Sequence, residues 1–241
     1  MSPAGPGLGT GARTVALELL KIEEPRFERA FDFVLASLAL AVSAPLWAAF
    51  ALAIKLDDGG PVLYRQRRWG RDKCPILVLK FRTMAEVVER RFENRQAEEN
   101  DPRITRVGRF LRATSLDEMP QILSIWRGEM SWVGPRALRI NELQINETNG
   151  HVPDEQIPGF DLRCRVRPGL TGLAQIYASR DVPRSNKFRY DALYIRKRGL
   201  WLDMKLISLS VWITLRGKWE SRHGKVVKRR IRPWRHGAGS E

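Results

Sequence analysis

Cysteine and histidine are scarce in this sequence of 241 residues, which contains two of the first and three of the second. Cys74 and Cys164 lie far apart and form no CxxC pair, so the sequence indicates neither a zinc site nor a disulfide framework and suits a reducing cytosol. The histidines are too scattered to indicate a metal cluster. Residues 1–25 lack the apolar core of a cleaved signal peptide and are predicted to be a flexible N-terminal segment.

Acidic residues are also few: 27 Asp and Glu stand against 42 Lys and Arg, which gives a formal net charge of +15. Such an excess calls for an anionic partner, namely nucleic acid, phospholipid headgroups or phosphorylated substrates, and charge alone does not choose among them. Residues 216–236 hold nine of the basic residues beside a single acidic one, Glu220. Because they follow the mostly apolar residues 200–215, we interpret residues 217–241 as a basic tail that binds anionic membrane lipids; a merely solvated tail is the alternative.

The longest apolar run extends from Phe31 to Ile54 and contains Pro45 near its middle. As one helix it would be about 36 Å long, enough to cross a bilayer core of about 30 Å. Proline interrupts helical hydrogen bonding, and Ser43 is placed to bond back to the Ala39 carbonyl and support a bend. Basic residues flank the run on both sides, whereas a spanning helix needs them on one side. We therefore predict a Pro-kinked, re-entrant helical hairpin over residues 26–56, with a kinked spanning helix and a buried core helix as alternatives.

The remaining pattern predicts a helix-rich α+β cytosolic domain over residues 57–216. Val62–Arg68 and Ile76–Arg82 are strand-like runs joined by a polar turn, which predicts a β-hairpin. Residues 85–100 are polar and charged and predict a solvated helix. Residues 200–215 are too short for a span and suit a core or interfacial helix.

Another predicted helix, around Leu116–Trp126, contains an acidic pair. Ser115 and Glu118 stand at capping-box spacing, and Pro120 fits only in the first turn, so Asp117 and Glu118 are expected near the helix N-terminus. Adjacent acidic residues are most often surface charges or helix caps. A carboxylate among phosphate-binding cations nevertheless has the properties of a nucleophile or a magnesium ligand. The surrounding sequence is rich in such cations: Arg103, Arg106, Arg109, Arg112, Arg127 and Arg136.

Two further segments are candidates for phosphate binding. Gly134-Pro135-Arg136 predicts a rigid turn that presents a guanidinium, although such a tripeptide is often only a turn. Lys80 and Arg82 alternate with an aromatic residue on a predicted strand, so both are expected on one side, where they line an anion pocket or face water.

Taken together, these pieces resemble the bacterial sugar transferases, the monotopic polyprenyl-phosphate phosphoglycosyl transferases, over about residues 26–217. The matching segments follow one another in the family's order. After the Pro-kinked apolar run they are GPVLYRQRRWG, KFRTM, DPRITRVGRFLRATSLDEMPQ, MSWVGPRA, RPGLTGLAQI and YDALYIRKRGLWLDMKLI.

The resemblance implies a re-entrant membrane helix and a catalytic face on the cytoplasmic side of the bacterial inner membrane. It implies transfer of a sugar-1-phosphate from a UDP-sugar to undecaprenyl phosphate with Mg²⁺ and release of UMP, as the first membrane step of polysaccharide or glycoconjugate synthesis. The family's acidic dyad falls on Asp117, as nucleophile and metal ligand, and Glu118. Its Pro-Arg-Pro turn falls on residues 135–137. The substrate- and phosphate-binding residues are then expected to be Lys80, Arg82, Arg112, Pro135, Arg136 and Arg180.

Three positions depart from the family pattern. Ala137 replaces the second proline of the turn, Ala44 stands where many relatives have serine before the kink proline, and Ser179 replaces a frequent glycine. The first places the rigidity of the turn in question. The chain also lacks the extra spanning helices of longer relatives, so we expect the minimal catalytic form, with self-association into a homo-oligomer left open.

Two other functional classes compete with this interpretation. A basic membrane adaptor or nucleic-acid binder accounts for the charge but not for the ordered motifs, and no aromatic stacking motif or zinc module is present, so we expect no nucleic-acid partner. A metal-dependent glycosyltransferase that moves the sugar alone would usually carry an Asp-x-Asp motif, which the sequence lacks. Release of UMP rather than UDP distinguishes the two enzymes.

Overall fold

The computed structural model describes residues 26–85, 101–140, 143–145, 151–179, 182–217 and 219. The flexible segment predicted for residues 1–25 and the site residue Arg180 lie outside the described residues. So do most of the helix predicted over residues 85–100 and the basic tail beyond residue 219.

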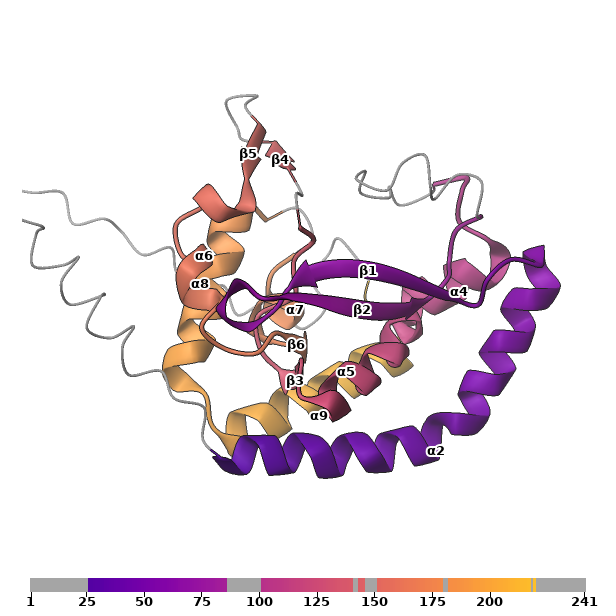
Figure 1. Cartoon of the computed structure of the whole chain (residues 1–241), viewed down its shortest axis with the longest axis horizontal. Helices are drawn as coiled ribbons and strands as arrows, with labels where there is room; N and C mark the ends of the chain where they lie inside the picture. The colour runs from indigo at the N-terminus through magenta and orange to yellow at the C-terminus, as the bar shows by residue number, and fades with distance from the viewer. Residues whose placement is uncertain are drawn as a thin grey trace, which may run out of the picture.

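Short strands and helices alternate along the described chain (Figure 1). The strands form three two-stranded sheets: antiparallel β1 (Leu63–Trp69) with β2 (Pro75–Phe81), parallel β3 (Ser131–Val133) with β6 (Gly169–Thr171), and antiparallel β4 (Leu143–Ile145) with β5 (His151–Pro153). The α-helices are α2 (Arg26–Asp58), α4 (Arg106–Thr114), α5 (Ile122–Arg127), α6 (Phe160–Arg163), α7 (Leu173–Tyr177), α8 (Arg184–Lys197) and α9 (Leu200–Leu215). Three 3-10 segments complete the set: η1 (Arg71–Lys73), η2 (Leu116–Gln121) and η3 (Asp154–Gln156). The predicted helix-rich α+β class is confirmed.

The β1–β2 hairpin matches the predicted one to within a residue at each end. Its turn is tight because Asp72 and Lys73 both adopt positive φ, at 51° and 61°, and the Gly70 N–H donates to the Cys74 carbonyl over 2.9 Å. The Asp72 N–H donates to the Cys164 carbonyl over 2.6 Å. This bond fixes the turn against the end of α6.

The helix α2 is one continuous helix of 33 residues with Pro45 inside it. Figure 1 shows a single ribbon whose axis changes direction, rather than two antiparallel arms, so the predicted hairpin is not confirmed. The predicted bond from Ser43 to the Ala39 carbonyl is wrong: the Ser43 hydroxyl is buried and has no hydrogen-bond partner among the described residues. Phe27–Asp58 is the one helix in the described chain that is long and apolar enough to cross a membrane. Only 11% of its apolar window is buried, which argues against a buried core helix.

Both ends of α2 bind the rest of the described chain, here called the body. Near its start, the Arg29 guanidinium donates to the carbonyls of Ile125 and Trp126 over 2.8 and 2.7 Å. Near its end, the Asp57 carboxylate accepts a 3.0 Å bond from the Val107 N–H in the first turn of α4. Its neighbour Asp58 forms a salt bridge with Arg82, just beyond β2. The middle of the helix leaves large apolar side chains exposed: Val34, Leu38, Val42 and Leu46.

A buried carboxylate, Asp32, connects α2 to the strand that precedes the Pro135-Arg136 turn. It accepts 3.1 Å bonds from the Ser131 hydroxyl and the Trp132 N–H, and it lies 3.1 Å from the Arg167 guanidinium. With 2% of its surface exposed, Asp32 is a paired charge rather than a solvated one. The first residues of β3 are therefore fixed to α2 on one side.

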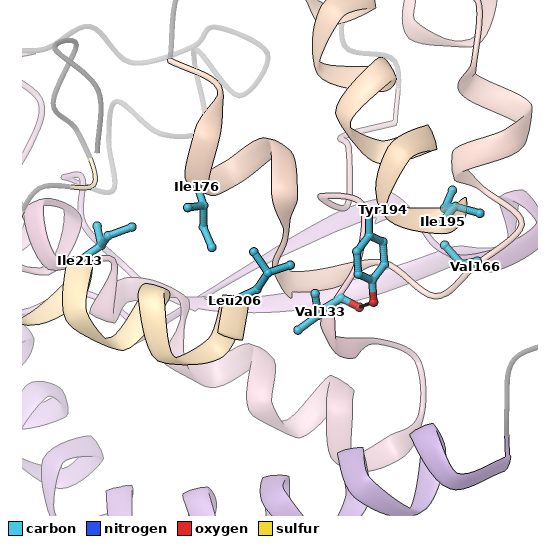
Figure 2. Close-up of a cluster of buried hydrophobic side chains, with 7 residues drawn as sticks. All are labelled: Val133, Val166, Ile176, Tyr194, Ile195, Leu206 and Ile213. Carbon is cyan, nitrogen blue, oxygen red and sulfur yellow. Dashed lines mark hydrogen bonds between the residues drawn. The ribbon is translucent and has the colours of Figure 1, made fainter. Parts of the chain in front are cut away.

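The other side of β3 is held by the largest hydrophobic cluster, which Figure 2 shows between α7, α8 and α9. The Tyr194 hydroxyl reaches the Val133 carbonyl at 3.1 Å and the Asp203 carboxylate at 2.9 Å. The buried members of the cluster are Val133, Val166, Ile176, Tyr194, Ile195, Leu206 and Ile213.

Outside this core, α4, α5 and α9 also expose large apolar side chains, namely Phe110, Trp126, Leu200, Trp201, Met204, Val211, Trp212 and Leu215. Together with the exposed face of α2 they exceed the scattered apolar residues of an ordinary surface. The structure is compatible with monotopic membrane association.

Candidate active site

The acidic pair lies in η2, a 3-10 segment, and not at the start of an α-helix. The predicted helix around Leu116–Trp126 divides into η2 and α5, with Pro120 inside η2. The predicted capping box is wrong, since Ser115 adopts φ 56° and its side chain makes no capping bond. The Glu118 side chain turns instead toward cations on two other segments. Glu118 is thus surrounded by side chains from other segments rather than placed at the N-terminus of an α-helix.

Glu118 is the centre of these contacts. Its Oε1 lies 2.5 Å from the Lys80 Nζ, which comes from β2. The same oxygen lies 2.5 Å from Nη2 of Arg136, and Oε2 lies 3.3 Å from Nη1, so the guanidinium binds both oxygens. Asp117 is farther away, with its Oδ2 3.8 Å from the Lys80 Nζ. Among the described residues no hydrogen bond reaches the Asp117 carboxylate, which leaves its oxygens available to a ligand.

The pKa values of the two carboxylates are shifted in opposite directions because their partners differ. Burial raises the pKa of Asp117 to about 6, since removal from water disfavours the charged form more than Lys80 favours it. Burial also acts to raise the pKa of Glu118, but the charges of Arg136 and Lys80 outweigh it and hold that pKa below its ordinary value. Burial lowers the pKa of Lys80, while both carboxylates oppose that shift. The pKa of Glu118 is thus held low by its two cations, whereas the pKa of Asp117 is raised by burial.

The turn that carries Arg136 is held by close backbone packing. The Gly134 N–H donates to the Thr171 carbonyl, and the Gly169 N–H to the Pro135 carbonyl, each over 2.9 Å. A Cβ on Gly169 would lie 2.0 Å from the Gly134 nitrogen, so only glycine permits this approach. Pro135 is fully buried in the turn. The spacing of glycines in GPR and RPGLTG therefore reflects the contact of two segments far apart in sequence.

The absent second proline is compensated by arginines beneath the turn. Arg68 Nη1 donates to the carbonyl of Ala137 over 2.6 Å, and Arg163 Nη2 donates to the carbonyl of Arg136 over the same distance. Ala137 itself is buried. The carbonyls of residues 136 and 137 are therefore both held by buried arginines.

A family description, bacterial sugar transferase, matches residues 23–217, most of the chain. The chain belongs to the bacterial sugar transferase family.

Individual relatives agree with this assignment. A Klebsiella pneumoniae protein named UDP-glucose:undecaprenyl-phosphate glucose-1-phosphate transferase is 42% identical over 191 residues, covering 77% of this chain and 39% of the relative. A protein of the same name from Escherichia coli K12 is 43% identical over 190 residues, with the same coverage. The exopolysaccharide production protein PSS of Rhizobium leguminosarum bv. phaseoli is 41% identical over 185 residues, covering 75% of this chain and 90% of the relative. The chain thus spans about two-fifths of the length of the first two relatives and most of the third.

Two other residues expected in the site, Arg112 and Arg82, differ in whether they lie near the acidic pair. Arg112, on α4, is close enough to favour the ionised form of Asp117. Arg82 is not part of the group around Glu118: its buried guanidinium donates to the Pro61 carbonyl over 2.6 Å and pairs with Asp58. Arg82 lies one residue beyond the end of β2, where the alternation of side chains along the strand no longer applies. The side chains of Lys80 and Arg82 therefore bind different partners. Arg82 fastens the end of α2 to the hairpin.

Sequence reasoning missed Gln66 and Arg68, which are buried on the inner side of β1. Arg68 donates to the Gln66 side-chain oxygen over 3.1 and 2.7 Å, and its charge adds to those that lower the pKa of Glu118. The basic run of β1 suggests a solvated strand. Its period of two, however, places Gln66 and Arg68 on one face and Arg65 and Arg67 on the other, and that signal could have found them.

The carboxylate oxygens of the site could hold Mg²⁺ only together with phosphate oxygens of a substrate. No cluster of three or more His, Cys, Asp or Glu side chains occurs in the described part of the chain. Both oxygens of Glu118 are occupied by Lys80 and Arg136, whereas those of Asp117 accept no hydrogen bond from the described residues. Magnesium in phosphate-transfer sites is typically held by one or two carboxylates together with substrate phosphates. Asp117 fits the role of that single carboxylate.

Proposed function

We propose that this protein transfers a sugar-1-phosphate from a UDP-sugar to polyprenyl phosphate, with release of UMP, at the cytoplasmic face of the bacterial inner membrane. The observation that carries the proposal is the Asp117 carboxylate, which accepts no hydrogen bond from the described residues, lies 3.8 Å from Lys80 and neighbours the Glu118–Arg136 pair. The names of the relatives support UDP-glucose as donor and undecaprenyl phosphate as acceptor. The exposed apolar helices support a lipid acceptor.

The reaction proceeds in two displacements. An oxygen of Asp117 attacks the phosphorus that carries the sugar, the bond between the two phosphates of the donor breaks, and UMP leaves with the bridging oxygen. The sugar phosphate is then held on Asp117 as an acyl phosphate. An oxygen of the polyprenyl phosphate attacks the same phosphorus and displaces the carboxylate, which regenerates Asp117. A soluble donor and a membrane-bound acceptor therefore need not occupy the site together.

Each remaining residue has a share in binding or orientation. Asp117 would hold Mg²⁺ with the donor phosphates, and the ion would screen the repulsion between carboxylate and diphosphate. Arg136 side-chain exposure is 43%, so its guanidinium can bind Glu118 on one side and a donor phosphate on the other. Lys80 is charged opposite both carboxylates and adds a second cation. Glu118 keeps the two cations in place.

The decisive assay screens UDP-sugars, UDP-glucose first, for UMP release by purified protein with Mg²⁺ and undecaprenyl phosphate. We expect UMP and a sugar-linked polyprenyl diphosphate in equal amounts, because the first displacement cleaves between the donor phosphates. UDP as the nucleotide product would identify an enzyme that moves the sugar alone. The absence of nucleotide turnover with every donor would favour the adaptor class instead.

Membrane insertion is proposed to be re-entrant, as the contacts at both ends of α2 suggest. Arg29 binds α5, and Asp57 binds α4, so the body holds both ends of the same helix. A helix that crosses the bilayer separates its ends by about 30 Å of hydrocarbon, and a body on one side would lose one set of these contacts. These contacts support a position of both ends on the same side of the membrane, which we propose is the cytoplasmic side.

Single cysteines introduced at Ser2 and Ser240 test this topology in a background where the exposed Cys74 is replaced by serine; Cys164 is buried. In intact cells we expect both introduced cysteines to be shielded from a membrane-impermeant thiol reagent, and both to react after cell lysis. Reaction of the Ser2→Cys variant alone in intact cells would show a spanning helix.

A further inference from the structure

A buried ion pair lies behind the Arg136 turn and takes no part in the proposed reaction. Arg163 at the end of α6 donates through Nε to the Asp191 carboxylate on α8 over 2.9 Å. The two side chains are 5% and 4% exposed. Figure 1 shows α6 beside α8, away from the exposed middle of α2. Burial of two charges is costly unless their hydrogen-bonding groups are well used, so this pair calls for an explanation.

Arg163 uses its planar fork in two directions. While Nε binds Asp191, Nη2 donates to the Arg136 carbonyl over 2.6 Å. The face of the guanidinium lies 4.7 Å from the centre of the Phe188 ring, which is also on α8. A carboxylate on one edge, a carbonyl on the other and a ring against the face leave the group little freedom. The carbonyl of Arg136 is consequently held in a fixed direction.

The position of that carbonyl matters because Arg136 is the residue that reaches Glu118. Its backbone is fixed by Arg163 and its side chain by Glu118, which restricts where the exposed part of the guanidinium points. A lysine in place of Arg163 could still neutralise Asp191, but a single ammonium lacks the planar fork that serves both contacts.

We propose that Arg163 and Asp191 are positioning residues, which act through the Arg136 backbone to aim its guanidinium at the donor diphosphate. The inference rests on the proposed function, because it assumes that Arg136 binds a phosphate of the UDP-sugar. It assigns a role in donor binding to α6 and α8, which contribute no side chain to the group around Glu118.

A double-mutant cycle between Arg163→Lys and Arg136→Ala tests the proposal on the full-length protein. We expect Arg163→Lys to weaken UDP-glucose binding, measured by calorimetry, and kcat/KM for UDP-glucose by about tenfold, the size of effect of one lost hydrogen bond to a charged group. KM for the polyprenyl phosphate should stay unchanged. In the Arg136→Ala background, Arg163→Lys should have no further effect, since its route of action is then absent.

Asp161→Asn is the matched control. Asp161 is also on α6, and its exposed carboxylate pairs with Lys73 over 2.6 Å at the hairpin turn. This variant should bind and turn over UDP-glucose like the unmodified protein. Should Arg163→Lys fail to fold in a thermal melt, Asp191→Glu replaces it in the cycle, because it keeps the charge pair and displaces the guanidinium.

The possible outcomes distinguish failure of the positioning role from failure of the proposed function. Additive effects of Arg163→Lys and Arg136→Ala, or normal UDP-glucose binding in Arg163→Lys, would overturn the positioning role while leaving the proposed function standing. Unmodified protein that neither binds UDP-glucose nor releases UMP from it would overturn the choice of donor and the inference together. Loss of the Arg163→Lys effect in the Arg136→Ala background, with an unchanged KM for the polyprenyl phosphate, is the result that supports the inference.

Discussion

Asp117→Asn is expected to reduce turnover by at least about a thousandfold, the scale seen when a covalent nucleophile is removed. The amide has nearly the shape of the carboxylate but no negative charge with which to attack phosphorus. The fold should survive, because the carboxylate accepts no hydrogen bond from the described residues and has one long contact, to Lys80. Steady-state UMP release and a thermal melt measure the two halves of this expectation.

The same variant decides whether the intermediate is covalent. Protein incubated with UDP-glucose and Mg²⁺ but no lipid should gain the mass of one sugar phosphate on the peptide that contains Asp117, and Asp117→Asn should gain none. Full activity of Asp117→Asn, once deamidation is excluded, would refute the assignment. An adduct that maps reproducibly to Glu118 would also refute it.

Sequence patterns singled out the acidic pair but not the contacts that surround it. The hairpin followed from alternation and a polar turn, which are local properties, and β1 and β2 agree with it to a residue. The capping role of Ser115 also seemed local, yet the backbone there turns left-handed and Glu118 binds cations from β2 and the Arg136 turn. Sequence spacing cannot show whether a side chain will cap its own helix or bind residues that the fold brings close from other parts of the chain.

The long apolar helix α2 shows a second limit of sequence patterns. Pro45 and the basic flanks predicted an interruption, whereas α2 continues through Pro45 and meets the body at both ends. Proline weakens a helix by removing one hydrogen bond, but it does not dictate whether the chain breaks or bends. That choice depends on contacts such as Asp32 with Trp132 and Arg82 with Asp58, and no periodicity in the sequence reveals them.

Glu118→Gln is expected to lower kcat by about a hundredfold, comparable to the loss of one preorganised electrostatic contact in an active site. The glutamine can still accept a hydrogen bond from Lys80 or Arg136, but the charge that holds both cations is gone. Burial already lowers the pKa of Lys80, and the charge of Glu118 is the largest influence that opposes it, so the pKa of Lys80 should fall further in the variant. The proposed binding of the UDP-sugar by Lys80 and by Arg136 would then be weakened at the same time.

Adduct formation separates this supporting role from a chemical one. In Glu118→Gln the sugar-phosphate adduct should still form on Asp117, at a reduced rate in rapid-quench measurements, because the nucleophile is intact. Glu118→Asp should recover part of the rate, since it restores the charge with a side chain one methylene shorter. Normal rates in Glu118→Gln would show that Lys80 and Arg136 need no anion between them. Complete absence of the adduct in a folded Glu118→Gln variant would instead give Glu118 a direct part in bond formation, and the supporting role would be wrong.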